Sequence, residues 1–157
     1  MKIRTKRILR WLVGVLALGA ILIQFVPVDR TNPPVTSEIQ VSVEVGAVLK
    51  RACYDCHSNE TEWPWYSRVA PISWLIAHDV REGRKALNFS TWGELGSDSR
   101  VEMLAESWEE VEEDEMPPWF YIAPHQDARL TTKDKAVLRV WALAGVSSRA
   151  LPEHEDE

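Results

Sequence analysis

Hydrophobic and polar positions divide the chain into an apolar segment, a polar stretch and a series of amphipathic segments. The apolar segment, residues 11–28, holds no charged side chain and one polar side chain, Gln24. A run of this length just crosses a bilayer as a helix. Basic residues precede it and Asp29 follows it, so the positive-inside bias predicts a cytoplasmic N-terminus and an exported remainder. We therefore expect residues 1–28 to be a membrane anchor.

A cleaved signal peptide is the alternative for the same residues. Small residues suited to cleavage occur at Ala17-Leu18-Gly19-Ala20. The apolar run continues beyond them to Val28, and cleavage there would leave an exposed apolar start, so a retained anchor is favoured. Residues 29–42 contain Pro33-Pro34 and show no periodicity, which predicts an extended linker. At about 3.3 Å per residue, such a linker spans tens of Å from the lipid.

Amphipathic segments within residues 43–146 predict a small all-α domain. Apolar side chains recur at helical spacing in four segments, residues 43–56, 70–87, 97–113 and 131–145. In the second segment the apolar stripe that we expect to face the core is Ile72, Leu75, Ile76 and Val80. We expect the last helix to pack across the first and close the core, and residues 147–157 to form a disordered acidic tail.

The first amphipathic segment leads into Cys53-Tyr54-Asp55-Cys56-His57, the CxxCH spacing at which c-type haem is attached. In that chemistry each thiol forms a thioether with a haem vinyl group, and the adjacent imidazole binds the iron. The sequence therefore predicts one haem c, with Cys53 and Cys56 as attachment points and His57 as the proximal iron ligand. Export supports this prediction, because c-type haem is attached outside the cytoplasmic membrane.

Three other structures can contain two cysteines at this spacing. A structural zinc site needs four ligands, and the sequence offers no second Cys or His pair at short spacing. A thioredoxin-like redox pair is expected after a strand, at the start of a helix, whereas the residues before Cys53 predict helix. A disulfide across so short a loop stabilises little. Haem is favoured over these three alternatives, which the sequence leaves open.

The Met116-Pro117-Pro118 segment predicts a rigid loop, because proline fixes its own φ and restricts the residue before it. Methionine opposite histidine is the axial pair that raises the potential of c-type haem. We therefore expect Met116 to be the distal iron ligand. His125 is the alternative, and would give a bis-histidine site of lower potential.

The segment from Asn59 to Arg68 is dense in aromatic residues and interrupted by proline, which predicts an ordered loop over the haem. We expect Trp65 and Tyr66 to border the haem pocket, with Arg68 able to bind a propionate. The alternative is an ordinary surface arginine beside core aromatics.

Charge is unevenly distributed along the chain. The net charge is −6, but residues 31–157 carry 12 basic and 23 acidic side chains, a net of −11. An acidic domain does not favour nucleic acid or anionic lipid as a partner. Six carboxylates lie within Glu109–Glu115, which indicates either a solvated helix end or a docking surface for a basic redox partner.

These features together resemble class I cytochrome c: a helix carrying CxxCH, a Met-Pro loop 59 residues after the histidine, and a C-terminal helix with an aromatic residue. More closely, residues 43–145 are similar to the bacterial haem-binding domain family whose members carry CxxCH. The similar segments are 53–57, 59–67, 70–74, 82–84, 88–90, 115–118 and 130–131. This resemblance implies haem binding, with Cys53, Cys56 and His57 in the roles already described.

The sequence thus predicts a membrane-anchored, periplasmic, monohaem electron-transfer protein. Its expected partners are the lipid bilayer, through the N-terminal helix, and an unidentified redox protein, with no nucleic acid. We expect no enzymatic turnover, because the sequence shows no nucleophile–base pair, phosphate loop or second metal cluster. A haem-based sensor or accessory subunit, in which Met116 leaves the iron, is the alternative. A structural metal or disulfide module without haem is a third.

Overall fold

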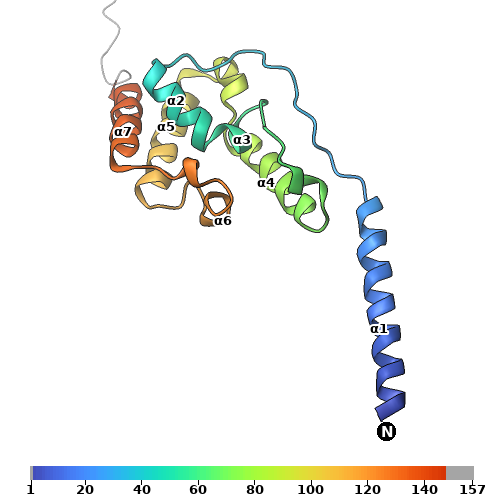
Figure 1. The fold of residues 1–157 in the computed structure, drawn as a ribbon. Coiled ribbons are helices and arrows are strands. Elements are labelled where there is room, and N and C mark those ends of the chain that lie inside the picture. The colour runs from blue at the N-terminus through green and yellow to red at the C-terminus, as the bar shows by residue number, and fades with distance from the viewer. Residues whose placement is uncertain (1, 148–157) are drawn as a thin grey trace, which may run out of the picture.

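The computed structural model describes residues 2–147, and every regular element in that range is helical (Figure 1). The four longer helices of the domain are α2 (Val43–Ala52), α4 (Ile72–Ala86), α5 (Ser97–Glu112) and α7 (Thr132–Ser147). Shorter elements are α3 (Tyr54–His57), α6 (Trp119–Ile122) and the 3-10 turns η2 (Trp65–Arg68), η3 (Phe89–Glu94) and η4 (Gln126–Ala128). The prediction of a small all-α domain is confirmed. Apart from Ser147, the predicted acidic tail lies outside the described residues.

The domain follows an apolar N-terminal helix, α1 (Lys2–Leu22), which ends in the 3-10 turn η1 (Ile23–Phe25). Figure 1 shows α1 projecting from one end of the domain. Residues Arg4–Phe25 have a mean hydropathy of 2.1, and none of the most apolar window is buried against the rest of the chain. By length and composition, this helix can cross a bilayer.

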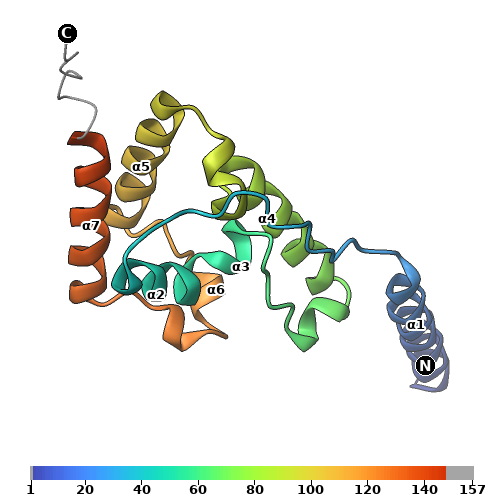
Figure 2. The same ribbon diagram turned by 90° about the horizontal axis from the view of Figure 1, so that it is seen from above.

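The core lies among α2, α5 and α7, at the end of the domain away from α1 (Figure 2). As expected, α7 packs across α2, and it also packs along α5. Each helix buries one apolar stripe, which places the following side chains in a shared cluster: Val48, Leu49, Leu104, Val111, Leu138 and Ala142. Through Val48 and Leu49, this cluster holds α2, the helix that leads into the CxxCH segment.

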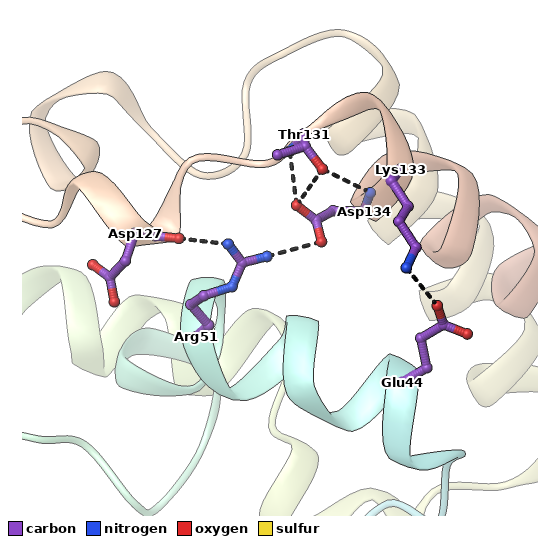
Figure 3. A network of polar contacts seen from close by, with 6 residues as sticks. All are labelled: Glu44, Arg51, Asp127, Thr131, Lys133 and Asp134. Carbon is purple, nitrogen blue, oxygen red and sulfur yellow. Dashed lines mark hydrogen bonds and ion pairs between the residues drawn. The ribbon is translucent and has the colours of Figure 1, made fainter.

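Polar contacts clamp the end of α2 to the start of α7 (Figure 3). The Arg51 guanidinium donates to the carbonyl of Asp127 at 2.6 Å and pairs with Oδ1 of Asp134 at 2.9 Å. The other oxygen of Asp134 accepts from the backbone N and the hydroxyl of Thr131, at 2.8 and 2.7 Å. Thr131 therefore caps α7, as the sequence indicates, and the same carboxylate binds α2.

Residues 29–42 form no helix and lie along the surface of the domain as an extended strap. The backbone N of Ser37 donates to the Ser90 carbonyl at 3.0 Å, and that of Ile39 donates to the Phe89 carbonyl at 2.9 Å. Ile39 is buried, and the Pro34 carbonyl accepts from the Asn59 amide at 2.9 Å. The strap therefore joins α1 to the domain through contacts along much of its length.

The apolar stripe of α4 is only partly in the core. Val80 is buried, but Ile72 and Leu75 are 49% and 56% exposed, so the expectation that they face the core is wrong. The reason is the rotation of α4, which turns Ser73 and Val80 inward and brings Gly83 against Cys56. The flank that carries Ile72 and Leu75 is left without a covering element among residues 2–147.

The candidate haem-attachment site

The CxxCH segment is formed by a break between two helices rather than by one continuous helix. The sequence predicts helix from residue 43 to 56, but α2 ends at Ala52 and Cys53 has a non-helical φ of −126°. The break turns Tyr54 into the core, where its ring stacks on Phe89 with 5.3 Å between centroids. The Cys53 carbonyl still accepts from the backbone N of Cys56 at 3.2 Å and of His57 at 2.9 Å. Cys53, Cys56 and His57 therefore lie together on one short turn.

Both thiols of this turn are free and half-buried. Burial, with the neighbouring thiol, raises the pKa of Cys53 to about 12, and burial, with Asp55 and Asp79, raises that of Cys56 to about 12. A thioredoxin-like pair needs the opposite environment, one that lowers a cysteine pKa. Within residues 2–147 no group of three or more His, Cys, Asp or Glu side chains is arranged to hold a metal ion by itself. The geometry therefore favours neither the redox pair nor the zinc site.

The imidazole of His57 is oriented by the C-terminal end of α4. Its Nδ1 donates to the carbonyls of Gly83 and Leu87, at 3.0 and 3.2 Å. Burial lowers the pKa of His57, although these two hydrogen bonds oppose the shift, so the ring is neutral at pH 7. With the proton on Nδ1, the lone pair is on Nε2. A histidine that donates from one ring nitrogen to a carbonyl in this way is prepared to bind a metal through the other.

Gly83 allows α4 to contact the turn directly. A Cβ atom at this position would lie 2.7 Å from the carbonyl oxygen of Cys56, closer than real Cβ contacts, and 3.1 Å from its Cβ, which is also tight. Only glycine fits without moving the backbone, and the same residue accepts the hydrogen bond from His57. In the sequence, Gly83 stands out only because it belongs to residues 82–84, one of the segments that resemble the haem-binding domain family. A glycine inside an amphipathic helix is the signal that identifies such a position, because glycine weakens a helix unless packing requires it.

Asp55, between the two cysteines, joins the turn to two other segments. Its Oδ1 accepts from the backbone N of Glu62 at 2.9 Å, its Oδ2 from the hydroxyl of Tyr121 at 2.8 Å, and its carbonyl from the hydroxyl of Thr61 at 2.7 Å. Burial, Asp55 and the two thiols raise the pKa of Tyr121, so its hydroxyl stays protonated and donates. Tyr121 belongs to α6, and this bond therefore holds α6 against the turn. Sequence reasoning missed it because the CxxCH pattern leaves this position unspecified.

The two predicted distal ligands, Met116 and His125, lie in the chain just before and just after α6. Nδ1 of His125 donates to the Tyr121 carbonyl at 3.0 Å, and its Nε2 accepts from the Tyr66 hydroxyl at 2.9 Å. Both ring nitrogens of His125 are therefore engaged within the protein. Met116 is 37% exposed, and its backbone N donates to the Glu110 carbonyl at 3.1 Å. The assignment of either residue to iron stays a prediction.

The predicted pocket residues of η2 lie in different surroundings. Tyr66 reaches the site through His125, and burial together with the charge of Asp55 raises its pKa. Trp65 is 77% exposed and packs edge-on against Tyr66, with 5.7 Å between ring centroids. Arg68 is exposed and lies at the end of α1, where it lines a hollow with Gln24. Of the three, Tyr66 has the closest connection to the turn; the haem roles of all three stay predictions.

Exposed apolar side chains lie on the two elements that contact the turn. On α4, whose Gly83 meets Cys56, Ile72 and Leu75 are exposed in the first half of the helix. On the loop that Tyr121 holds against the turn, the exposed side chains are Met116, Trp119 and Phe120. These side chains are available to cover an apolar ligand. Free thiols, a prepared imidazole nitrogen and apolar flanks form a set that fits a haem.

A second hollow in the domain does not fit a haem. It has a volume of about 670 Å³ and lies between the start of α2 and α7, where its lining includes Val41, Val45 and Trp141. Neither cysteine nor His57 lines it. A covalently attached haem therefore belongs at the turn and not in this hollow.

A family model described as a haem-binding domain matches residues 18–144 of the chain. The match contains the turn, α4, the Met116 loop and most of α7. No curated protein and no solved structure matches the chain.

Proposed function

The chain belongs to the haem-binding domain family and binds haem, and we propose that it carries one covalently attached haem c as a membrane-anchored, periplasmic electron-transfer protein. The observation that supports covalent attachment is the arrangement of the turn, where two free thiols stand beside an imidazole whose Nδ1 is already bound to two carbonyls. Bound haem supplies a one-electron Fe(III)/Fe(II) couple.

Cys53 and Cys56 are the proposed attachment residues. Each thiol would hold the haem by adding its S–H across one vinyl double bond, with sulfur on one carbon and hydrogen on the other, an addition that needs no oxidant. His57 would hold the iron through Nε2. The carbonyls of Gly83 and Leu87 keep the ring in one orientation and increase the basicity of Nε2.

Met116 is the proposed distal ligand. Its partly exposed thioether and its position before two prolines support this assignment, and the engagement of both His125 nitrogens disfavours the alternative. The partial exposure of Met116 also supports the sensor alternative, because a residue on an exposed loop could leave the iron. The two functions therefore differ in whether the sixth position is permanently filled.

The proposed location and partners follow from the ends of the domain. α1 is long and apolar enough to span the membrane, and its flanking charges favour a cytoplasmic N-terminus. The carboxylates of Glu109–Glu115 are exposed at the end of α5, which supports docking of a basic redox partner there.

The decisive experiment is production of the full chain together with a cytochrome c maturation system. We expect the haem to stay with the polypeptide after extraction by acidified acetone and to give a pyridine haemochrome spectrum of the c type. A double variant, Cys53→Ala with Cys56→Ala, is the control and should release its haem under the same extraction. A colourless chain, produced while a control cytochrome matures, would contradict covalent attachment.

Carbon monoxide separates the carrier from the sensor. A carrier with a permanently filled sixth position should bind the gas slowly or not at all in the reduced state. Rapid binding by the reduced wild-type protein would favour the sensor.

A further inference from the structure

The end of α1 is bonded to the domain before the strap begins. The side-chain amide of Gln24 donates to the carbonyl of Ala70 at 3.2 Å, and its Oε1 accepts from the backbone N of Ala70 at 2.9 Å. Gln24 is the one polar side chain in the apolar run of residues 11–28. A polar group next to the hydrocarbon is best hydrogen-bonded; the Gln24 amide also donates to the Ala20 carbonyl of α1 at 3.0 Å, and the domain supplies the other two bonds. The domain therefore sits directly at the end of the candidate span.

Two arginines lie beside Gln24, at the end of the candidate span. Arg30 and Arg68 line a hollow of about 160 Å³ together with Gln24 and Ala70. Arg30 also donates to the Ser67 carbonyl at 3.4 Å, which places it against the segment that leads into α4. Among the described residues that line this hollow there is no carboxylate, although Asp29 is next to Arg30 in the chain. Guanidinium groups just outside the hydrocarbon are positioned to pair with lipid phosphates.

Exposed apolar side chains lie on the segments that carry these arginines or adjoin the hollow. Phe25 and Val26 are exposed at the end of η1, and Val69, next to Ala70, is 42% exposed. Trp65 and Trp74 are exposed from η2 and α4. Trp74 lies on the side of α4 opposite Gly83, so it does not belong to the flank that meets the CxxCH turn. Tryptophan and arginine next to an apolar span are typical of the membrane interface.

The densest cluster of acidic side chains lies at the other end of the domain. The carboxylates of Glu109–Glu115 lie at and just beyond the end of α5. Figures 1 and 2 both show α5 and α7 at the end of the domain away from α1. The densest acidic cluster is thus remote from α1, whereas basic and aromatic side chains, with the exposed carboxylate of Asp29 beside Arg30, lie next to it.

We propose that the surface formed by Phe25, Arg30, Trp65, Arg68, Val69 and Trp74, the α1 corner, rests in the headgroup region of the outer leaflet and binds lipid phosphate. The proposal rests on the membrane anchoring of α1 proposed above and goes beyond it, and it assigns Trp65 and Arg68 to lipid in place of the haem pocket that the sequence predicts. It places the haem domain on the bilayer in one orientation, in contrast to a domain held away from the lipid by a spacer.

Photocrosslinking of the full chain tests this surface. Benzoylphenylalanine in place of Val69 is compared with benzoylphenylalanine in place of Val140, an exposed residue of α7 at the other end of the domain. Both proteins are irradiated in vesicles of phosphatidylethanolamine and phosphatidylglycerol, and lipid adducts are measured by mass spectrometry. We expect the lipid adduct at position 69 to exceed that at position 140 several-fold. Gln24→Met, which removes both bonds to Ala70, should lower the adduct at position 69 several-fold.

An alkaline carbonate wash of the same vesicles separates this proposal from the anchor. A chain that is retained, but gives equally low lipid adducts at the two positions, would overturn the α1 corner and leave the anchor intact. Crosslinks from position 69 to a second copy of the chain in place of lipid would also overturn it. Release of the chain by the wash would refute the anchor itself, and this proposal with it.

Discussion

The CxxCH turn and the Met116 loop supply the two proposed faces of one iron site, yet the protein holds them differently. In the turn, Tyr54 and Ser58 are buried, and the Ser58 hydroxyl donates to the Tyr54 carbonyl at 2.8 Å. His57 is fixed by two carbonyls of α4. In the loop, Met116, Trp119 and Phe120 are exposed. The protein alone therefore prepares the proximal side of the site and leaves the distal side open.

The difference has a structural reason. The two thiols and the imidazole lie within five positions of the chain, so one turn and its contacts with α4 hold all three. Met116 belongs to a separate loop, and the exposed apolar side chains beside it would gain burial from a bound haem.

Loss of the proximal imidazole should have the largest effect. We expect His57→Ala to incorporate much less haem, because no imidazole would position the iron while the thioether bonds form, whereas Met116→Ala should incorporate it normally and lose the weak absorption band at the red end of the spectrum. Haem content per chain by pyridine haemochrome measures the difference, and far-UV circular dichroism checks that both variants are folded. Equal haem content in the two variants would contradict the asymmetry.

Gly83→Ala should come next, because it drives α4 away from the turn. The new Cβ would meet the Cys56 carbonyl oxygen at 2.7 Å, and overpacking of this kind costs about 1–3 kcal/mol. We expect a lower urea midpoint and reduced haem incorporation. Gly46→Ala in α2 is the matched control: its Cβ would make an ordinary 3.5 Å contact with Val41, so stability should rise by up to about 1 kcal/mol. Similar behaviour of the two variants would show that close packing at Gly83 is unimportant.

Tyr121→Phe tests the connection between the two sides. It removes the hydrogen bond to Asp55 and should cost about 1 kcal/mol of stability. We also expect the reduced protein to bind carbon monoxide faster, since the loop is less firmly held. Tyr66→Phe loses only its bond to His125 and serves as the control. If both variants bind the gas at the wild-type rate, the Tyr121 bond does not hold the distal side.

The smallest effect is expected for Asp134, which pairs with Arg51 and so joins the start of α7 to the end of α2. Partial burial opposes the charge of Asp134, but hydrogen bonds from Thr131 and Arg51 outweigh it and lower its pKa below 3.8. A carboxyl whose pKa is lower in the folded state than in the unfolded state stabilises the fold at pH values above the unfolded-state pKa. This contribution is lost as the pH falls through the folded-state pKa. Asp134→Asn should therefore be less stable than wild type at pH 7, by at most about 1 kcal/mol.

Urea midpoints at pH 7 and pH 3 measure this contribution. The difference between wild type and Asp134→Asn should shrink at pH 3, below the ordinary carboxyl pKa of 3.8, where the unfolded chain binds a proton at Asp134 that the folded carboxyl resists. Glu44→Gln, which removes only the exposed pair with Lys133 at 3.5 Å, should match wild type at both values. A difference between wild type and Asp134→Asn that does not change with pH would exclude the charge as the cause.

Local patterns predict the helical class well, and they predict the helix ends less well. The helical spacing of apolar residues gives α2, α4, α5 and α7 to within a few residues, because period and capping are properties of neighbouring positions. The break at Cys53 was not predicted, since it depends on Tyr54 packing against Phe89, 35 residues later. The orientation of α4 was misjudged for the same reason.

By itself, the sequence determined an apolar N-terminal helix, an all-helical domain and a CxxCH segment whose chemistry points to haem. Only the tertiary structure decided that Gly83 and Leu87 orient His57, that Asp55 binds Tyr121, and that Gln24 joins α1 to Ala70. The physical reason is that covalent chemistry and helical period are carried by side chains near one another in the chain. Backbone carbonyls that accept hydrogen bonds from distant segments look alike at every residue, so only the fold selects among them.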